Sequence, residues 1–291
     1  MFSIIGIVVL MVCVFGGYIM AGGSMAPIIK AAPIETFIIG GAAVGAMLIG
    51  NSLDIVKGAF GGILRCFKGP KYKKDDYLQV IFLVSKLMKV LKAEGAVALE
   101  PHIENPDSSA IFAEYPPILK DEGLLHLVCD TIRLLVVSSS NLSPYAVEEV
   151  MDQAIKTHHH GELKPAEALA SMAGALPALG IVACVLGVVK TMGAIDQPPP
   201  VLGALIGGAL VGTFLGVFLA YGLIGPMSAR LQNVIDEDGA FYRIIQSVLV
   251  AHLHGNAAQI SVEIGRGSVP SGAQPSFLEL EEALSNIPNE A

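Results

Sequence analysis

The sequence has no tryptophan, and only 15% of its 291 residues are charged. Soluble domains average about 25% charged residues. Hydrophobic residues make up 53% of the chain, and the mean hydropathy is +0.63. So little charge combined with so much apolar content is typical of a membrane protein and unlike a soluble globular domain.

Metal-binding and redox motifs are missing as well. The chain has four cysteines, none in a CxxC motif: Cys13, Cys66, Cys129 and Cys184. We expect them to be reduced, small apolar residues. The run His158 to His160 lacks the neighbouring ligands that a metal site needs, and adjacent histidines on a helix point in different directions. We interpret this run as a solvated cytosolic turn, and we expect no metal and no cofactor.

Catalytic arrangements are also absent from the apolar stretches. They contain no Ser/Lys dyad, no paired Asp and no HExxH motif, which argues against an intramembrane enzyme. We therefore expect a protein that is not an enzyme. A self-contained secondary transporter would carry ion-binding polar groups of its own within the spans.

Long runs with little or no charge are what the sequence has in abundance. Four segments are near or above the roughly 20 residues that a helix needs to cross a bilayer. They cover residues 1–20, 33–50, 168–189 and 197–229. The first lacks the basic region and cleavage site of a signal peptide, so we expect it to be a retained span.

Basic residues set the expected orientation. Nine lie in residues 51–100, whereas residues 21–32 and 190–196 hold only Lys30 and Lys190. Because short cytoplasmic loops are rich in Lys and Arg, both termini are predicted to lie in the cytosol.

The predicted fold is therefore an all-α membrane protein with four transmembrane helices and a large helical cytoplasmic insertion between spans 2 and 3. Its four expected segments are transmembrane helices 1 and 2 (1–50), a cytoplasmic helical domain (51–167), transmembrane helices 3 and 4 (168–229), and a cytoplasmic C-terminal helix with a flexible acidic tail (230–291).

Helices within the insertion follow from local signals. One is predicted at Tyr77 to Lys92, after Asp75 and Asp76, with Gly95 ending it. Lys86, Lys89 and Lys92 form a stripe on one face of this helix. Further helices are expected at residues 117–137, 145–158, 230–254 and 277–284, and residues 104–109 (ENPDSS) are expected to form a turn.

Small residues recur every four positions in the spans. Gly208, Gly212 and Gly216 share one face of the fourth span, and such spacing lets membrane helices approach closely. This face can pack within one chain, or between copies or around a partner helix; the sequence leaves these alternatives open. Pro177 and Pro226 each remove a helical hydrogen bond, as a structural kink or as a functional hinge.

No carboxylate is expected deep in the membrane. Glu35 is expected near the end of the second span, and Lys190 just beyond the third. If the chain conducts ions, the titrating group would then have to come from another polypeptide.

Three segments carry a resemblance to a known family. Residues 176–193 (LPALGIVACVLGVVKTMG), residues 201–226 (VLGALIGGALVGTFLGVFLAYGLIGP) and residues 92–106 (KAEGAVALEPHIENP) resemble signature segments of the MotA family, the A subunits of the bacterial flagellar stator. The resemblance implies a proton channel in the inner membrane, with five A subunits around two MotB-type B subunits. The B subunit supplies the titrating Asp and a peptidoglycan anchor, and the rotor switch protein FliG is the implied torque partner.

The resemblance also implies roles for single residues. Pro177 and Pro226 match the prolines that couple ion passage to movement. Lys92 and Glu100 match the rotor-contacting pair, in which the family usually has Arg at the first position; Lys keeps the charge but loses the planar fork.

The ion pathway of the family points to Thr213 and Cys184. Sodium-driven members have a Thr where Cys184 stands, and because a thiol is a poor sodium ligand, protons are the expected ion. A sodium-driven stator is the nearest alternative. An ExbB/TolQ-type pump is the next, although it has three spans per chain.

Overall fold

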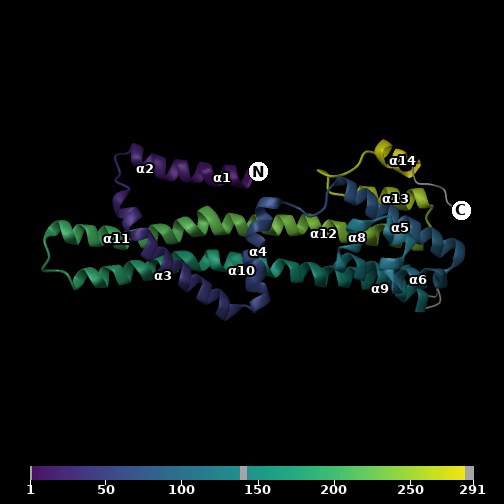
Figure 1. The fold of residues 1–291 in the computed structure, drawn as a ribbon, viewed down its shortest axis with the longest axis horizontal. Helices are drawn as coiled ribbons and strands as arrows, with labels where there is room; N and C mark the ends of the chain where they lie inside the picture. The colour runs from purple at the N-terminus through teal and green to yellow at the C-terminus, as the bar shows by residue number, and fades with distance from the viewer. Residues whose placement is uncertain (1, 138–142, 286–291) are drawn as a thin grey trace. The chain divides into compact units, whose positions relative to one another are not determined.

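The computed structural model describes residues 2–137 and 143–285, and all of the regular elements in these ranges are helices (Figure 1). Four helices are long and apolar enough to cross a membrane. They are Phe2–Met20, Ala26–Gly50, Pro144–Met192 and Pro199–Leu253. The predicted all-helical class with four membrane helices is confirmed.

The chain divides into two compact units, and each unit is built from two separate stretches. Unit 1 comprises Met1–Gly69 and Glu162–Val234, and unit 2 comprises Pro70–Gly161 and Ile235–Ala291. All four apolar stretches of the sequence fall in unit 1.

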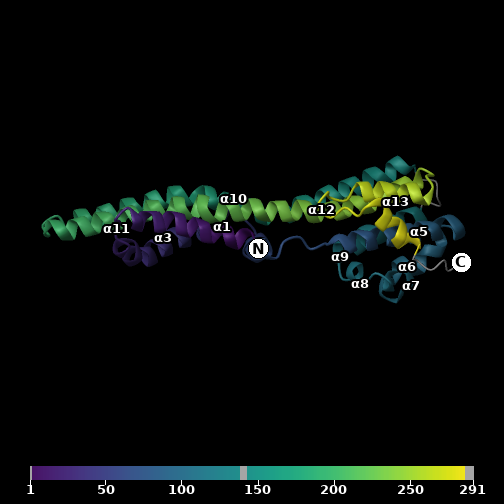
Figure 2. The ribbon, with the colours of Figure 1, turned by 90° about the horizontal axis from the view of Figure 1, so that it is seen from above.

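Unit 1 begins with an α-helix that is interrupted by a π-helical turn. It consists of α1 (Phe2–Met11), a π-helical turn η1 (Val12–Gly16) and α2 (Gly17–Met20). Next come α3 (Ala26–Gly50) and α4 (Leu53–Lys68). The unit continues with the second part of α10 (Pro144–Met192), α11 (Pro199–Val217), the π-helix η4 (Phe218–Ile224) and the start of α12 (Gly225–Leu253). α3 packs against α11 (Figures 1 and 2).

The second membrane helix starts earlier than the sequence predicts. α3 begins at Ala26, with Pro27 in its first turn, instead of at Pro33. Proline suits the first turn of a helix because the amide it lacks has no partner there. The helix then continues through Pro33, so Glu35 is the tenth of its 25 residues.

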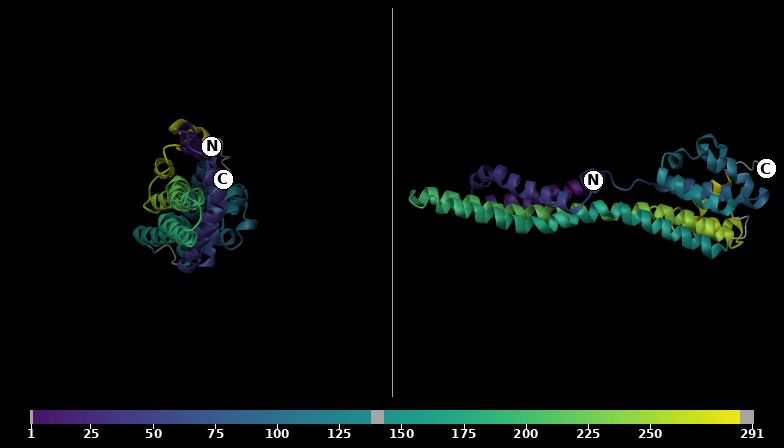
Figure 3. Two further views of the ribbon diagram at one scale, coloured as in Figure 1. Left: turned by 90° about the vertical axis from the view of Figure 1, so that its left-hand side faces the viewer. Right: turned by 90° about the horizontal axis from the view of Figure 1, so that it is seen from below.

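Unit 2 is made of shorter helices. They are α5 (Lys74–Glu94), η2 (Ala96–Leu99), α6 (Glu100–Glu104), η3 (Pro106–Ser108), α7 (Ala110–Ala113), α8 (Pro116–Leu119), α9 (Glu122–Val137), the first part of α10, the rest of α12, α13 (Ala258–Gly267) and α14 (Phe277–Ser285). α13, from the C-terminal stretch, packs on α5, from the insertion (Figure 3). The two stretches share one core, in which Phe112 and Phe241 are almost fully buried.

Local signals explain where α5 ends and where α9 begins. Gly95 follows the last residue of α5 with φ +86°, as predicted, because this backbone conformation suits glycine. The helix predicted at residues 117–137 is broken in two. Asp121 separates α8 from α9, and its side chain accepts a hydrogen bond from the Leu124 amide at 3.3 Å, which caps α9.

The histidine run is helical, so the predicted turn at His158 to His160 is wrong. All three residues lie inside α10. The His158 ring is 4.7 Å from the ring of Tyr242, and His159 Nε2 is 3.1 Å from Asp236 Oδ1. These contacts on the neighbouring helix give the run a packing role that its sequence did not reveal.

Candidate functional site

In unit 1, α10 and α11 approach each other closely through glycines. A Cβ atom on Gly216 would lie 2.7 Å from the Leu176 carbonyl oxygen and 2.9 Å from Gly180 Cα. A Cβ on Gly180 would lie 2.9 Å from the Gly212 carbonyl oxygen. Since no side chain fits at these distances, the two backbones pack directly on each other.

The third glycine of the predicted set has a different environment. A Cβ on Gly208 would meet only the Ala31 side chain, at an ordinary 3.9 Å. Gly180 and Gly187 were not singled out from the sequence, yet α11 approaches both closely. Their spacing of seven residues, two helical turns, is the signal that could have identified them.

The predicted ion-pathway residues lie level with this contact. Gly212, the neighbour of Thr213 on α11, would bring a Cβ to 3.4 Å from the Cys184 amide nitrogen on α10. The same Cβ would lie 2.7 Å from Glu35 Oε2 on α3. Three helices therefore meet at Gly212, and the carboxyl of Glu35 is among the groups at that point.

The two predicted coupling prolines have different settings. Pro177 lies inside α10 and is half-buried, one residue after the buried Leu176. Pro226 is exposed and follows the π-helix η4, where the Gly225 amide donates to Ala220 O, five residues back. Prolines and π-turns both interrupt the regular ladder of helical hydrogen bonds, so both sites are points where a helix can bend.

The predicted rotor-contacting residues lie in unit 2, and both are exposed. Lys92 is in the last turn of α5, and Glu100 is the first residue of α6. Among the described residues no ion pair joins them. Lys86, from the same lysine stripe, instead pairs with Glu114 at 2.6 Å, which leaves Lys89 and Lys92 as the solvent-facing charges of the stripe.

A buried acidic residue anchors the segment that enters unit 2. Asp121 is 5% exposed; it accepts hydrogen bonds from Lys71 Nζ at 2.5 Å and from the Tyr72 hydroxyl. Burial opposes its ionisation, but these hydrogen bonds outweigh burial and hold the pKa of Asp121 below its ordinary value. The Lys71 amide also donates to Asp238 at 2.7 Å, and the ring of Tyr72 stacks on Phe241.

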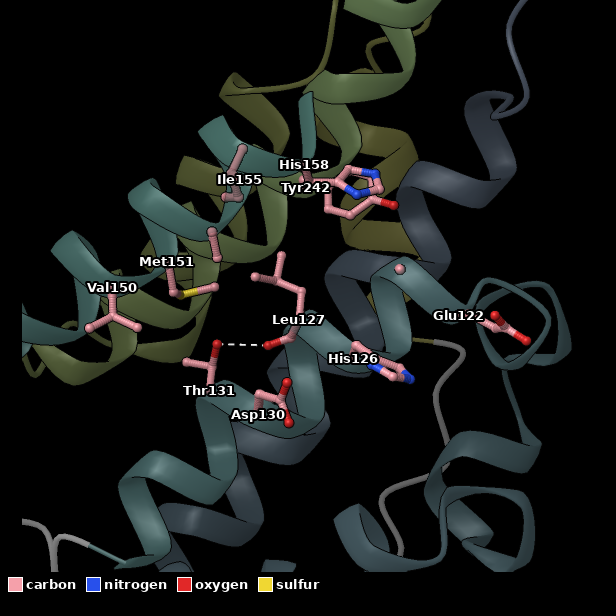
Figure 4. Close-up of a pocket in the computed structure, with 12 residues that line it drawn as sticks. Glu122, His126, Leu127, Asp130, Thr131, Val150, Met151, Ile155, His158 and Tyr242 are labelled. Carbon is pink, nitrogen blue, oxygen red and sulfur yellow. Dashed lines mark hydrogen bonds between the residues drawn. The ribbon is translucent and has the colours of Figure 1, made fainter. Parts of the chain in front are cut away.

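A cavity of about 480 Å³ lies between α9, α10 and α12 in unit 2 (Figure 4). Its wall combines the apolar Met151 and Ile155 of α10 with Glu122, His126 and Asp130 of α9 (Figure 4). None of the residues singled out as a functional site from the sequence lines it. In residues 2–137 and 143–285 there is also no group of three or more His, Cys, Asp or Glu side chains that could hold a metal ion.

The four cysteines are free thiols in the structure. Burial raises the pKa of Cys66 and raises the pKa of Cys129 to about 11. Because the thiolate is the reactive form, the raised pKa lowers the reactivity of these two side chains.

Two family models match the chain. The model "Motility protein A N-terminal" covers residues 4–95, and the model "MotA/TolQ/ExbB proton channel family" covers residues 121–242.

Full-length relatives and solved structures agree with these matches. The chain is 40% identical to "Motility protein A" of Salmonella typhimurium over 289 residues, which cover 99% of this chain and 97% of the relative. It is 39% identical to "Motility protein A" of Escherichia coli with the same coverage. The fold is similar to that in the "Structure of the flagellar MotAB stator complex from Bacillus subtilis", with a TM-score of 0.70, 20% identity, and coverage of 96% of this chain and 100% of that chain.

Proposed function

This chain belongs to the motility protein A family of flagellar stator subunits, and we propose that it couples proton flow across the bacterial inner membrane to torque on the rotor. The observation that carries this proposal is the 40% identity to a motility protein A over 99% of the chain. Four apolar helices within the same chain supply the membrane part that a channel subunit requires.

The proposed complex contains a second polypeptide. A MotB-type subunit, in a ratio of five A to two B, would contribute the Asp that binds the transported proton. The solved relatives named MotAB support a B-type partner and an oligomer. The Lys- and Arg-rich residues 51–100 support an orientation with both termini in the cytosol.

The proposed division of labour assigns conduction to unit 1 and torque to unit 2. Cys184 and Thr213 would flank the ion path, and Pro177 and Pro226 would let the helices bend when the partner's Asp changes charge. Lys92 and Glu100 would face the charged surface of the rotor protein FliG. The exposure of both side chains supports this assignment.

Protons are the proposed ion because of the thiol at Cys184. Sodium needs several oxygen ligands to replace its hydration shell, and sulfur is a poor substitute for an oxygen in that set. A proton needs only a titratable acceptor and a short path of water or hydroxyl groups.

The function is tested by reconstituting the chain in vesicles with and without a B-type partner. We expect proton flux only when the partner is present, and loss of flux when the partner's Asp is replaced by Asn. Robust flux through the purified chain alone would overturn the division of roles between the two subunits.

Ion choice is tested by swimming speed as sodium is replaced by potassium at fixed pH and membrane potential. Speed that follows the proton gradient and ignores sodium would support the proposal. Speed that collapses without sodium would assign the chain to sodium-driven stators.

A further inference from the structure

The four apolar stretches of the sequence contain a single carboxylate, Glu35. As the tenth residue of α3, it lies about 14 Å along the helix axis from Ala26, at a rise of about 1.5 Å per residue. It is 8% exposed within this one chain. Glu35 is therefore largely covered by its own chain and lies inside a helix long and apolar enough to cross a membrane, where an ionisable group is costly and is ordinarily retained for function.

The surroundings of Glu35 provide no compensating charge. Its Oε2 atom is buried and has no hydrogen-bond partner among the described residues. α11, which packs on α3, has no titratable side chain at all. The titratable groups on the apolar part of α10 are Cys184 and Lys190, and α3 itself adds Lys30; both lysines are exposed.

Gly212 makes the space that the carboxyl occupies. A Cβ at this position would stand 2.7 Å from Glu35 Oε2, closer than a carbon and an oxygen can pack. Gly212 thus leaves room for the carboxyl, and it also lets α11 pack closely against Ala183 and Cys184 of α10. Any larger residue at Gly212 would force the carboxyl out of this niche.

The protonation state follows from this environment. An ionised carboxylate whose buried oxygen has neither a donor nor a nearby cation loses hydration without compensation, and this favours the neutral acid. A neutral carboxylic acid of this kind can release its proton and take one up again without leaving its place.

We propose that Glu35 is a second proton-exchanging carboxyl of the stator, carried by this chain and held as the neutral acid opposite Gly212. The proposal rests on the proposed function, since Glu35 meets Gly212, which lies close to the Cys184 amide and precedes Thr213, the two residues of the suggested ion path. In each exchange the O–H bond of the acid breaks, the proton passes to a water molecule or to the partner's carboxylate, and the remaining carboxylate takes a proton from the opposite side.

The protonation state is tested by infrared difference spectroscopy on the complex with its B subunit, reconstituted in lipid at neutral pH. The parent should show the carbonyl band of a protonated carboxyl, shifted in D2O and missing in Glu35→Gln. Identical spectra of parent and Glu35→Gln in this region would overturn the proposal. The measurement needs no ion flux, so it can be read even if the proposed function fails.

Exchange is tested by proton flux in the same vesicles. Glu35→Gln keeps the shape of the neutral acid but cannot release a proton, so we expect intact assembly with a several-fold loss of flux. Flux equal to that of the parent would show that Glu35 does not exchange protons. Absence of flux in the parent itself would count against the proposed function, not against the assignment of Glu35.

The niche is tested with Gly212→Ala, which should reduce both assembly and flux by displacing the carboxyl. The control is Gly207→Ala on the same helix, where a Cβ meets nothing within 4 Å in this chain. If Gly212→Ala acts through Glu35, adding Glu35→Ala should restore assembly but leave flux low. Assembly that stays defective in the double variant would mean that Gly212 serves helix packing alone.

Discussion

Unit 1 and unit 2 use opposite means to hold helices together. The core of unit 2 is filled with large side chains, among them Phe112, Phe241 and Leu83. The core of unit 1 is small, includes Ala43, Ala183 and Ala220, and is supplemented by direct backbone contact at glycines. In water, burying large apolar groups drives association, whereas in lipid close packing must replace that driving force.

The two units also differ in how their buried carboxyl groups are hydrogen-bonded. In unit 2 the buried Asp121 has several donors, while in unit 1 the buried Glu35 Oε2 has no hydrogen-bond partner among the described residues. A satisfied carboxylate stabilises a fold, and an unsatisfied one is retained for chemistry. This difference agrees with the proposed division of labour, in which unit 1 carries ion passage and movement.

The largest effect is expected from Pro177→Ala in unit 1. Restoring a backbone amide removes the point at which α10 can bend, so assembly should persist while rotation is abolished or severely slowed. Motor rotation and the amount of complex in the membrane are measured together, with Pro165→Ala in the same helix as the control. Loss of the complex from the membrane would show that Pro177 is only a structural kink.

The next effect concerns the surface of unit 2. The double reversal Lys92→Glu with Glu100→Lys should nearly abolish swimming, and each single replacement should only weaken it, because screened charges contribute about 0–1 kcal/mol each. Swimming speed with an unchanged rotor is the readout, and Glu281→Lys, at another exposed acidic residue, is the control. A double variant that swims like the parent would refute the assignment.

Truncating the core of unit 2 should cost stability. Phe112 is 0% exposed, and Phe112→Ala should lower the free energy of unfolding by about 3–5 kcal/mol, since it removes apolar contacts and leaves a cavity. Hydrogen exchange of the unit 2 amides in the purified complex measures this loss. Val97→Ala, at a position that is 71% exposed, should change stability by less than about 0.5 kcal/mol.

Asp121→Asn should destabilise unit 2 by about 2–3 kcal/mol, because Lys71 and Tyr72 lose a charged acceptor. The pKa of Asp121 is held below its ordinary 3.8. Its contribution is therefore fully present above that value and is lost only as the pH falls through the lower, folded-state pKa. Hydrogen exchange from roughly pH 5 to 8 should show a constant difference between variant and parent. A difference that shrinks within this range would contradict the assigned state of Asp121.

The smallest effect is expected at the exposed ion pairs of unit 2. Arg133 lies 2.8 Å from Glu104 and 2.6 Å from Asp130, with 42% of its side chain exposed. Arg133→Ala should lower the stability of unit 2 only slightly, and high salt should remove most of this loss. A larger loss that resists salt would mean that unit 2 depends on its surface charges as much as on its core.

Much of this fold can be predicted from the sequence because it depends on local signals. Long apolar runs predict the membrane helices, and Gly95 marks the end of α5. The sequence prediction missed the start of α3 because Lys30 is charged and Pro33 commonly marks a helix start. Residues 26–32 are nevertheless helical. The helical state of His158 to His160 also escaped prediction, because it depends on contacts with Asp236 and Tyr242, far away in the sequence.

The residues of the candidate site also divide into those that the sequence reveals and those that only the packed structure reveals. Pro177, Lys92 and Glu100 can be singled out from their segments alone. The position of Glu35 against Gly212 cannot, because it results from the packing of two helices whose sequences do not record which faces meet. Gly180 is a similar case, since its neighbours on α11 become apparent only when the helices are assembled.

The discontinuous core of unit 2 has a consequence for synthesis of the protein. Buried side chains between Tyr77 and Ile155 share one core with residues that follow residue 240, such as Phe241, Val248 and Val262. At about 5–20 residues per second, the ribosome needs several seconds to pass from the first group to the second, and it must deliver two membrane helices in between. During that interval the insertion exposes apolar surface to solvent, and exposed apolar surface of this kind is what chaperones bind.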